Sequence, residues 1–245
     1  MKEITKARRF IKEMVNVYDA QSKVESHTKK CCAIERGRIK CVSSMLEDKF
    51  ALYLGTYLIG NDPRFTVYVD YPISIKPGIV RYGKSTRQKC SFYPDIMICK
   101  KMRDKRIVAV YMANVKTSVG WFRDHIDEIG DEHAYYAEQM VGKPASFRRD
   151  DEADEMQKVS MTISKNCLND IIVLSSCAPK TDNVEEQIRN FNKEHRAGMT
   201  QFIVLSPDNI NPKYGDKHDI NNRGWNMLYA RVCRAIGRKK VKFSA

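Results

Sequence analysis

The sequence predicts an α/β fold, with a central β-sheet that carries helices on both faces. Short runs of β-branched and apolar residues alternate along the chain with longer segments of helical periodicity. Two of the runs, residues 93–99 and 107–116, are apolar almost throughout, which is typical of central strands covered on both sides. The chain has 245 residues, of which 42% are hydrophobic, and this is enough for one sizeable domain with a packed core.

The first part of the chain is predicted to be a helical and basic arm, residues 1–42. Apolar side chains in residues 3–20 recur at helical spacing, whereas residues 22–41 are polar and basic and are expected to form a connector or a short helix. No later stretch has the composition of a linker between two domains. We therefore expect residues 43–245 to form a single domain.

The domain is expected to begin with a buried helix. Ser43 or Ser44 fits the N-cap position, and Glu47 follows in the first turns. Apolar residues then continue at helical spacing to Gly60, which predicts the end of the helix there.

The other elements follow in order from the period of the apolar residues. Strands are predicted at 65–69, 93–99, 107–116, 170–174 and 201–205. Helices are predicted at 121–141, 153–165, 184–195 and 225–238. Loops are predicted at 76–91 and 207–222, and the acidic run 150–155 is expected to be a solvated loop or the start of a helix.

The charge of the chain favours a polyanion as its partner. The net charge is +13 and the pI is about 9.3. No acidic residue follows Asp219, whereas seven lysines and arginines do. Nucleic acid is the commonest partner of so basic a protein. A soluble protein that is simply rich in lysine is the alternative, and charge alone does not exclude it.

Targeting and redox signals point to the inside of a cell. No apolar run is long enough to cross a bilayer, and residues 1–6 lack the apolar centre of a signal peptide. The eight cysteines form no CxxC pair, so reduced thiols are expected. A zinc site at His27, Cys31, Cys32 and Cys41 is a weak alternative, because adjacent cysteines ligate one tetrahedral ion awkwardly. We expect a soluble cytoplasmic protein with no membrane partner.

Polar residues mark the ends of the two most apolar strands. Asp95 opens the first apolar run, and Asn114 and Lys116 end the second. Residues 114 and 116 are separated by one position, so in a strand both side chains point to the same face. If the two strands form a hairpin, Asp95 meets them at one end of the sheet. Glu47, on a helix packed over that sheet, could supply a further oxygen.

This combination of residue types suits hydrolysis of a phosphodiester bond. Magnesium prefers oxygen ligands and is usually held by one or two carboxylates together with water and phosphate oxygens. The metal neutralises the phosphate and lowers the pKa of an attacking water. A lysine beside that water can orient it and offset developing negative charge.

The pattern Pro94-Asp95 followed by Asn114-x-Lys116, with Glu47 upstream, resembles the PD-(D/E)xK nuclease superfamily, which includes the type II restriction endonucleases. The resemblance implies a restriction-endonuclease-like core with a mixed central sheet. It also implies an Mg²⁺-dependent endonuclease that cleaves double-stranded DNA and acts as a homodimer, because cutting both strands calls for two sites.

The resemblance covers roughly residues 43–122 and includes the passage from strand to helix at 117–121. Lys116 is implied to act on the attacking water. The implied metal ligands are Asp95, the residue at 114, Val115 and Glu47. The basic loop at 84–89 and the residues after Lys116 are implied to contact the DNA backbone, and loop residues further on could reach phosphates or bases. The candidates for DNA contact are Lys84, Arg87, Lys89, Thr117, Ser118 and Arg223.

Asn114 departs from the family pattern, which has a carboxylate at this position. An Asn is nearly isosteric with Asp but lacks its negative charge, so it should bind magnesium more weakly and slow catalysis. Three explanations are open: a deliberate disabling substitution, a natural protein that binds nucleic acid without cleaving it, or replacement by another carboxylate such as Asp70. We favour the first, because Asp95, Lys116 and Glu47 all remain.

Other motifs are weaker. The spacing of His125, Asp131, Glu132 and His133 matches neither HExxH nor its inverted form, so ordinary helix polarity is the better interpretation. The chain contains no GxGxxG, no GxxxxGK[ST] and no GxSxG. A ligand-sensing or scaffolding α/β protein with a basic surface remains a third hypothesis, beside the nuclease and the silent binding protein.

Overall fold

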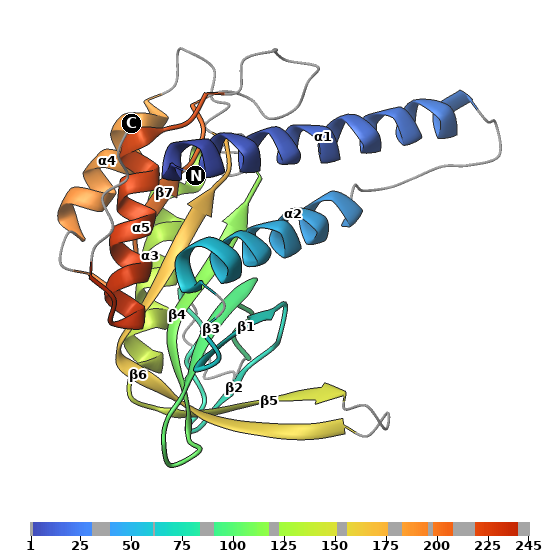
Figure 1. Ribbon diagram of the computed structural model, residues 1–245. Helices are drawn as coiled ribbons and strands as arrows, with labels where there is room; N and C mark the ends of the chain where they lie inside the picture. Colours follow the sequence, from blue (N-terminus) through green and yellow to red (C-terminus); the bar gives the residue numbers. More distant parts are fainter. Residues whose placement is uncertain are drawn as a thin grey trace.

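The computed structural model contains a mixed seven-stranded sheet with helices packed on it (Figure 1). The strands run in the order β1-β3-β4-β6-β5-β2, and β7 pairs with β6. The structure describes residues 2–30, 40–60, 62–83, 91–117, 123–150, 156–175, 183–195, 198–207 and 219–239.

The strands form an antiparallel part and a parallel part. β1, β3 and β4 form an antiparallel meander, and β6 then runs parallel to β4, with β7 parallel to β6. β5 and β6 form a long antiparallel ribbon that extends away from the rest of the sheet (Figure 1). The strands are β1 Phe65–Val69, β2 Ser74–Ile75, β3 Ile96–Lys101, β4 Ile107–Lys116, β5 Pro144–Asp150, β6 Met156–Val173 and β7 Phe202–Val204.

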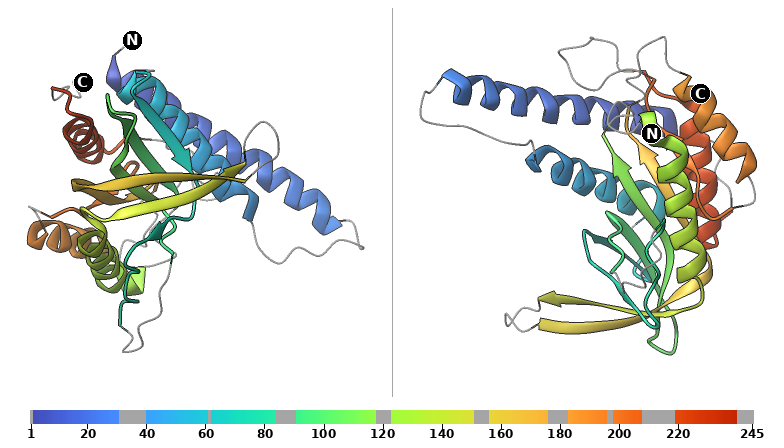
Figure 2. Two further views of the ribbon diagram at one scale, coloured as in Figure 1. Left: turned by 90° about the horizontal axis from the view of Figure 1, so that it is seen from below. Right: turned by 180° about the vertical axis from the view of Figure 1, so that it is seen from behind.

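Helices cover both faces of the sheet, as Figure 2 shows in the view from below. One face carries α1, α2 and α5, and the other carries α3 and α4. Along β6, Ile172 is buried in the cluster under α1, α2 and α5, whereas Ile171 and Val173 are buried in the cluster under α3 and α4. This alternation is the two-residue period of a strand. The helices are α1 Glu3–Lys30, α2 Lys40–Tyr53, the π-helix η1 Leu54–Ile59, the 3₁₀ turn η3 Arg123–His125, α3 Ile126–Met140, α4 Val184–Glu194 and α5 Asn222–Ile236.

Most of the predicted elements are present. The five predicted strands overlap β1, β3, β4, β6 and β7, with the bounds of β3, β6 and β7 differing by one to three residues at the ends predicted, and the helices predicted at 121–141, 184–195 and 225–238 correspond to α3, α4 and α5. The helix predicted to stop at Gly60 does so, because Gly60 adopts a left-handed conformation (φ 66°) that closes the final π-helical turn. The predicted cap at Ser43 or Ser44 is wrong, since α2 already begins at Lys40.

One further prediction is wrong. Residues 153–165 were expected to be helical, but from Met156 onward they belong to strand β6. Val159, Met161 and Ile163 are buried, whereas Ser160 and Thr162 are exposed, which is the period of a strand and not of a helix. Residues 22–41 were expected to form a connector or a short helix, and as far as Lys30 they continue the helix α1.

The N-terminal helix shares the main hydrophobic core. Phe10, Ile11 and Met14 of α1 are buried in the same cluster as Leu46 and Phe50 of α2. None of the helices in the described part of the chain is long and apolar enough to span a membrane.

Candidate functional site

The sheet brings three polar residues, Asp70, Asp95 and Asn114, next to one another at the carboxyl end of β4. The last pair of β1 and β3 is Val69 with Ile96, and the backbone N–H of Asp70 then donates to the backbone oxygen of Asp95 at 2.9 Å. Asp70 therefore continues the ladder directly beside Asp95.

On the other side of Asp95, the ladder continues to β4. Ile96 pairs with Ala113, so Asp95 lies next to Asn114. A hydrogen bond from the backbone N–H of Val115 to Oδ2 of Asp95, 2.6 Å long, fixes this side chain against the end of β4. The predicted neighbours Asp95, Asn114 and Lys116 are thus brought together, with Asp70 as an additional member.

The surroundings of the Asp95 side chain raise its pKa. Burial raises its pKa, and the negative charge of Asp70 raises it further. The positive charge of Lys116 and the hydrogen bond from Val115 oppose this rise, but burial outweighs them. The Asp95 carboxyl is therefore less readily ionised than a carboxyl in water.

Glu47 is part of the same electrostatic group. It lies on α2, which packs on one face of the sheet through Leu46 and Phe50, and its side chain is partly buried. Burial raises the pKa of Glu47 to about 7, and the charges of Asp95 and Asp70 add to the effect, against the opposing charge of Lys116. From the helix predicted to pack over the sheet, Glu47 thus interacts electrostatically with Asp95 and Asp70.

Asn114 points to the opposite face of the sheet. Ala113 and Val115 are buried under α2 and α5, so the side chains between and beyond them leave the strand toward α3. There Nδ2 of Asn114 lies 3.4 Å from Nδ1 of His133, and Asn114 is only 5% exposed. Lys116 is the last residue of β4 and is partly exposed.

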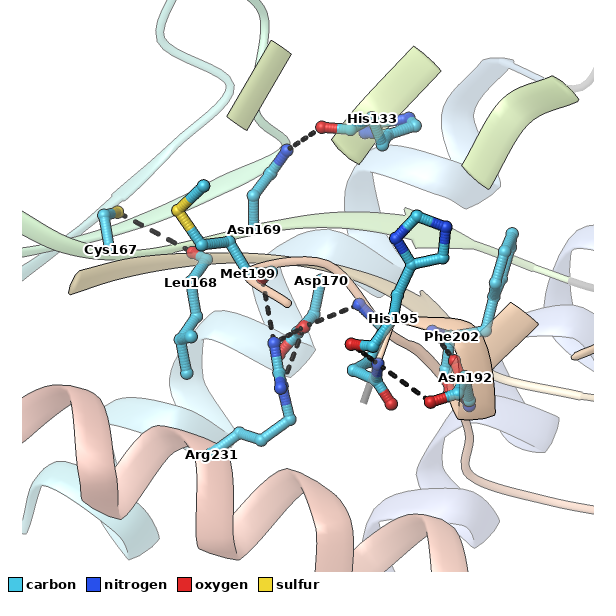
Figure 3. Close-up of polar contacts among 11 residues, drawn as sticks. His133, Cys167, Leu168, Asn169, Asp170, Asn192, His195, Met199, Phe202 and Arg231 are labelled. Carbon is cyan, nitrogen blue, oxygen red and sulfur yellow. Dashed lines mark hydrogen bonds and ion pairs between the residues drawn. The ribbon is translucent and has the colours of Figure 1, made fainter. Parts of the chain in front are cut away.

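His133 is a neighbour that its sequence position did not reveal. Burial and, to a smaller extent, the positive charge of Lys116 lower the pKa of His133 to about 4. The ring is therefore neutral near pH 7 and can accept a hydrogen bond from the amide of Asn114. The side-chain N–H of Asn169 donates to the backbone oxygen of His133 at 3.3 Å and ties this turn of α3 to β6 (Figure 3).

Two of the other residues weighed from the sequence, His125 and Asp131, make surface ion pairs. His125 lies 3.3 Å from Glu128, and Asp131 lies 3.7 Å from His195. Neither contact involves the site. Only His133 of the four residues weighed from the sequence contacts the row of polar residues in the described structure.

The predicted DNA contacts are only partly described. Thr117 follows β4 directly, and Arg223 is exposed in the first turn of α5. Backbone hydrogen bonds lead across the sheet from Lys116 to Leu174, from Val173 to Leu205 and from Leu205 to Asn221, so α5 begins at the same end of the sheet as the site. Lys84, Arg87, Lys89 and Ser118 lie outside the described residues.

The donor types at this end of the sheet fit a hard cation. Asp70, Asp95 and Glu47 supply carboxylate oxygens, which are the donors that Mg²⁺ prefers, and the charges of Asp95 and Asp70 contribute, after burial, to the raised pKa of Glu47. Within the described ranges, however, no three His, Cys, Asp or Glu side chains stand close enough together to hold an ion. The zinc ligands considered from the sequence have no described side chains.

Comparison with family models, curated proteins and solved structures found no match for this chain. The α/β class and the mixed sheet therefore rest on the structure alone.

Proposed function

We propose that this chain is an endonuclease of the restriction type, with Mg²⁺ as cofactor and double-stranded DNA as substrate. The observation that carries the proposal is the row of Asp70, Asp95 and Asn114 across three strands, with Lys116 on the same strand as Asn114. The mixed sheet with helices on both faces agrees with a restriction-endonuclease-like core. The net charge of +13 suits a polyanionic substrate.

Asp70 supports the third explanation for Asn114, in which another carboxylate replaces the missing one. Its backbone N–H is hydrogen-bonded to the backbone oxygen of Asp95, and its negative charge raises the pKa of both Asp95 and Glu47. Asp70 also has a left-handed backbone (φ 53°), which is uncommon for a residue other than glycine and is often found at functional sites. We propose that Asp70 and Asp95 are the principal acidic ligands, together with the backbone oxygen of Val115, and that Glu47 lies beside them without binding the metal.

Each remaining residue then has a role. Bound Mg²⁺ would neutralise the scissile phosphate and lower the pKa of an attacking water. Lys116 orients that water and offsets the charge that develops on the phosphate. Glu47, with a pKa of about 7, can accept a proton near neutral pH. Neutral His133 accepts from the amide N–H of Asn114, which leaves the amide oxygen free to face the site.

The second candidate is a catalytically silent nucleic-acid-binding protein on the same fold. Two observations favour it: Asn114 carries no charge, and one carboxylate oxygen of Asp95 is already engaged by the N–H of Val115. Two copies of the chain acting as a homodimer belong to the first candidate, because cleavage of both strands calls for two sites.

The test is cleavage of supercoiled plasmid DNA with Mg²⁺ by the wild type and by the variants Asp70→Asn, Asp95→Asn and Asn114→Asp. Slow cleavage by the wild type that disappears in both Asn variants supports replacement by Asp70. An inactive wild type with an active Asn114→Asp variant makes Asn114 a disabling residue. Asn166→Asp adds the same charge at an exposed position and should change nothing.

The nuclease proposal fails if the wild type, Asn114→Asp and Asn114→Glu all bind Mg²⁺ and DNA but cleave no DNA or RNA. That result would favour the silent binding protein.

A further inference from the structure

The turn between β3 and β4 is tight and strongly basic. Residues 100–106 include five lysines and arginines and a single acid. The backbone N–H of Met102 donates to the oxygen of Arg106 at 2.8 Å, and that of Lys105 donates to the oxygen of Met102 at 3.0 Å. Lys105 takes the left-handed conformation that closes the turn (φ 65°). The turn is thus held by its own hydrogen bonds while its side chains remain exposed.

Most of the positive charge of this turn is not compensated nearby. The one acid, Asp104, is engaged by Arg106 at 2.6 Å. Lys101, Arg103 and Lys105 are all exposed, and none of them forms an ion pair with another described residue. Three cations therefore project from one fixed turn.

The exposed face of the β5–β6 ribbon adds positive charge at the same end of the sheet. Arg148 is paired directly with Lys158 across the ribbon, and both are exposed. Like charges in this position repel each other. Val108 pairs with Thr162, so the turn before β4 lies beside the base of the ribbon, as Figures 1 and 2 show. The acidic run 150–155 follows β5 in the sequence and lies outside the described residues from 151 on, and the test variants are therefore confined to the turn.

We infer that the β3–β4 turn is a second contact for the phosphate backbone of duplex DNA, at the opposite end of the sheet from Asp95. The inference rests on the proposed function for the identity of the polymer. β3 spans the distance between the two ends with the residues Ile96–Lys101, which corresponds to about 20 Å of extended chain. Because successive phosphates of one strand are about 3.4 Å apart along the axis, this separation corresponds to about six base pairs.

The experiment measures duplex binding by fluorescence anisotropy in EDTA, so that no cleavage occurs, at several salt concentrations. The test variant Arg103→Gln with Lys105→Gln removes two charges from the turn. The control Arg189→Gln with Lys193→Gln removes two exposed charges from α4. The swap Arg103→Lys with Lys105→Arg keeps the charge and tests for electrostatic recognition.

The test variant should bind a duplex of about 24 base pairs roughly tenfold more weakly, and the slope of log K against log salt should fall in magnitude by about 2. A duplex of about six base pairs should show a smaller difference, because it cannot reach both ends of the sheet. The control and the swap should bind like the wild type.

If the wild type binds the duplex and the test variant binds it with the same affinity, the inference is overturned and the proposed function is left intact. Equal weakening by the test variant and the α4 control also overturns it, because only overall charge would then matter. A wild type that binds no duplex at low salt overturns the proposed function as well. Loss of binding to anionic vesicles with unchanged duplex binding would assign the turn to a membrane surface instead.

Discussion

Replacing Glu47 with Gln should stabilise the protein at high pH and leave its stability unchanged at low pH. The pKa of Glu47 rises from an ordinary value of 4.5 to about 7, first because of burial and then because of the charges of Asp95 and Asp70. A carboxyl whose pKa is higher in the folded than in the unfolded state favours folding when protonated. That contribution is complete below pH 4.5 and is lost as the pH rises through 7.

The full difference in pKa corresponds to an upper limit of about 3 kcal/mol. Because the side chain is only partly buried, solvent screening reduces the expected effect to roughly 1–2 kcal/mol. Glu47→Gln, which cannot ionise, should therefore exceed the wild type by this amount at pH 8 and match it at pH 4.5.

Urea unfolding of both proteins between pH 4 and pH 8.5 measures the difference directly. Glu138→Gln removes an exposed carboxylate from α3 and serves as the matched control. Addition of Mg²⁺ at pH 8 should reduce the advantage of Glu47→Gln, because a cation near Glu47 relieves the same repulsion in the wild type. Parallel stability curves for Glu47→Gln and wild type across the whole range would refute the electrostatic reasoning.

Three more predictions follow from contacts in the structure. Arg231→Met should lower the free energy of unfolding by about 3–5 kcal/mol, because it leaves the fully buried Asp170 without its charged partner. In the structure, Nε of Arg231 donates hydrogen bonds to both carboxylate oxygens of Asp170 (Figure 3). A loss below about 1 kcal/mol in urea unfolding would contradict this. Gly224→Ala should cost about 3 kcal/mol by the same measurement, because a Cβ at this position would overlap the backbone oxygen of Val204. Asp95→Asn should weaken stabilisation by Mg²⁺ in a thermal shift assay, and an unchanged shift would remove Asp95 from the metal site.

The strands of the central meander were predictable because each is short, apolar and bounded by charged or turn residues. β4, for example, begins after the basic turn and ends at Lys116, as its sequence indicates. The N-terminal half of β6 was missed because residues 153–165 are polar enough to resemble a surface helix. Pairing with β5 decides their conformation, since Phe147 and Val159 are opposite each other and buried on the inner face of the ribbon. That pairing is not visible in either segment alone.

The site was predictable only where residue type and spacing carry the information. Asp95 and Lys116 stand at the ends of recognisable strands, and Glu47 stands on a recognisable helix. The position of Asp70 depends on the register between β1 and β3, and that of His133 depends on how α3 packs on the sheet. Neither is determined by local sequence: a shift of one residue in the β1–β3 register would turn Asp70 to another face, and the packing of α3 depends on residues far away in the chain.

The charge of the site offers a physical reason for an amide at position 114. Burial, and after it the negative charges of Asp95 and Asp70, already raise the pKa of Glu47 to about 7. A fourth carboxylate at Asn114, which is only 5% exposed, would add negative charge where the one described hydrogen-bond partner of the side chain is a neutral His133. The free protein would then be less stable unless a cation were bound or His133 took up a proton. Asn114 keeps the hydrogen bond to α3 without that repulsion, so the amide is consistent with a site whose second carboxylate comes from Asp70.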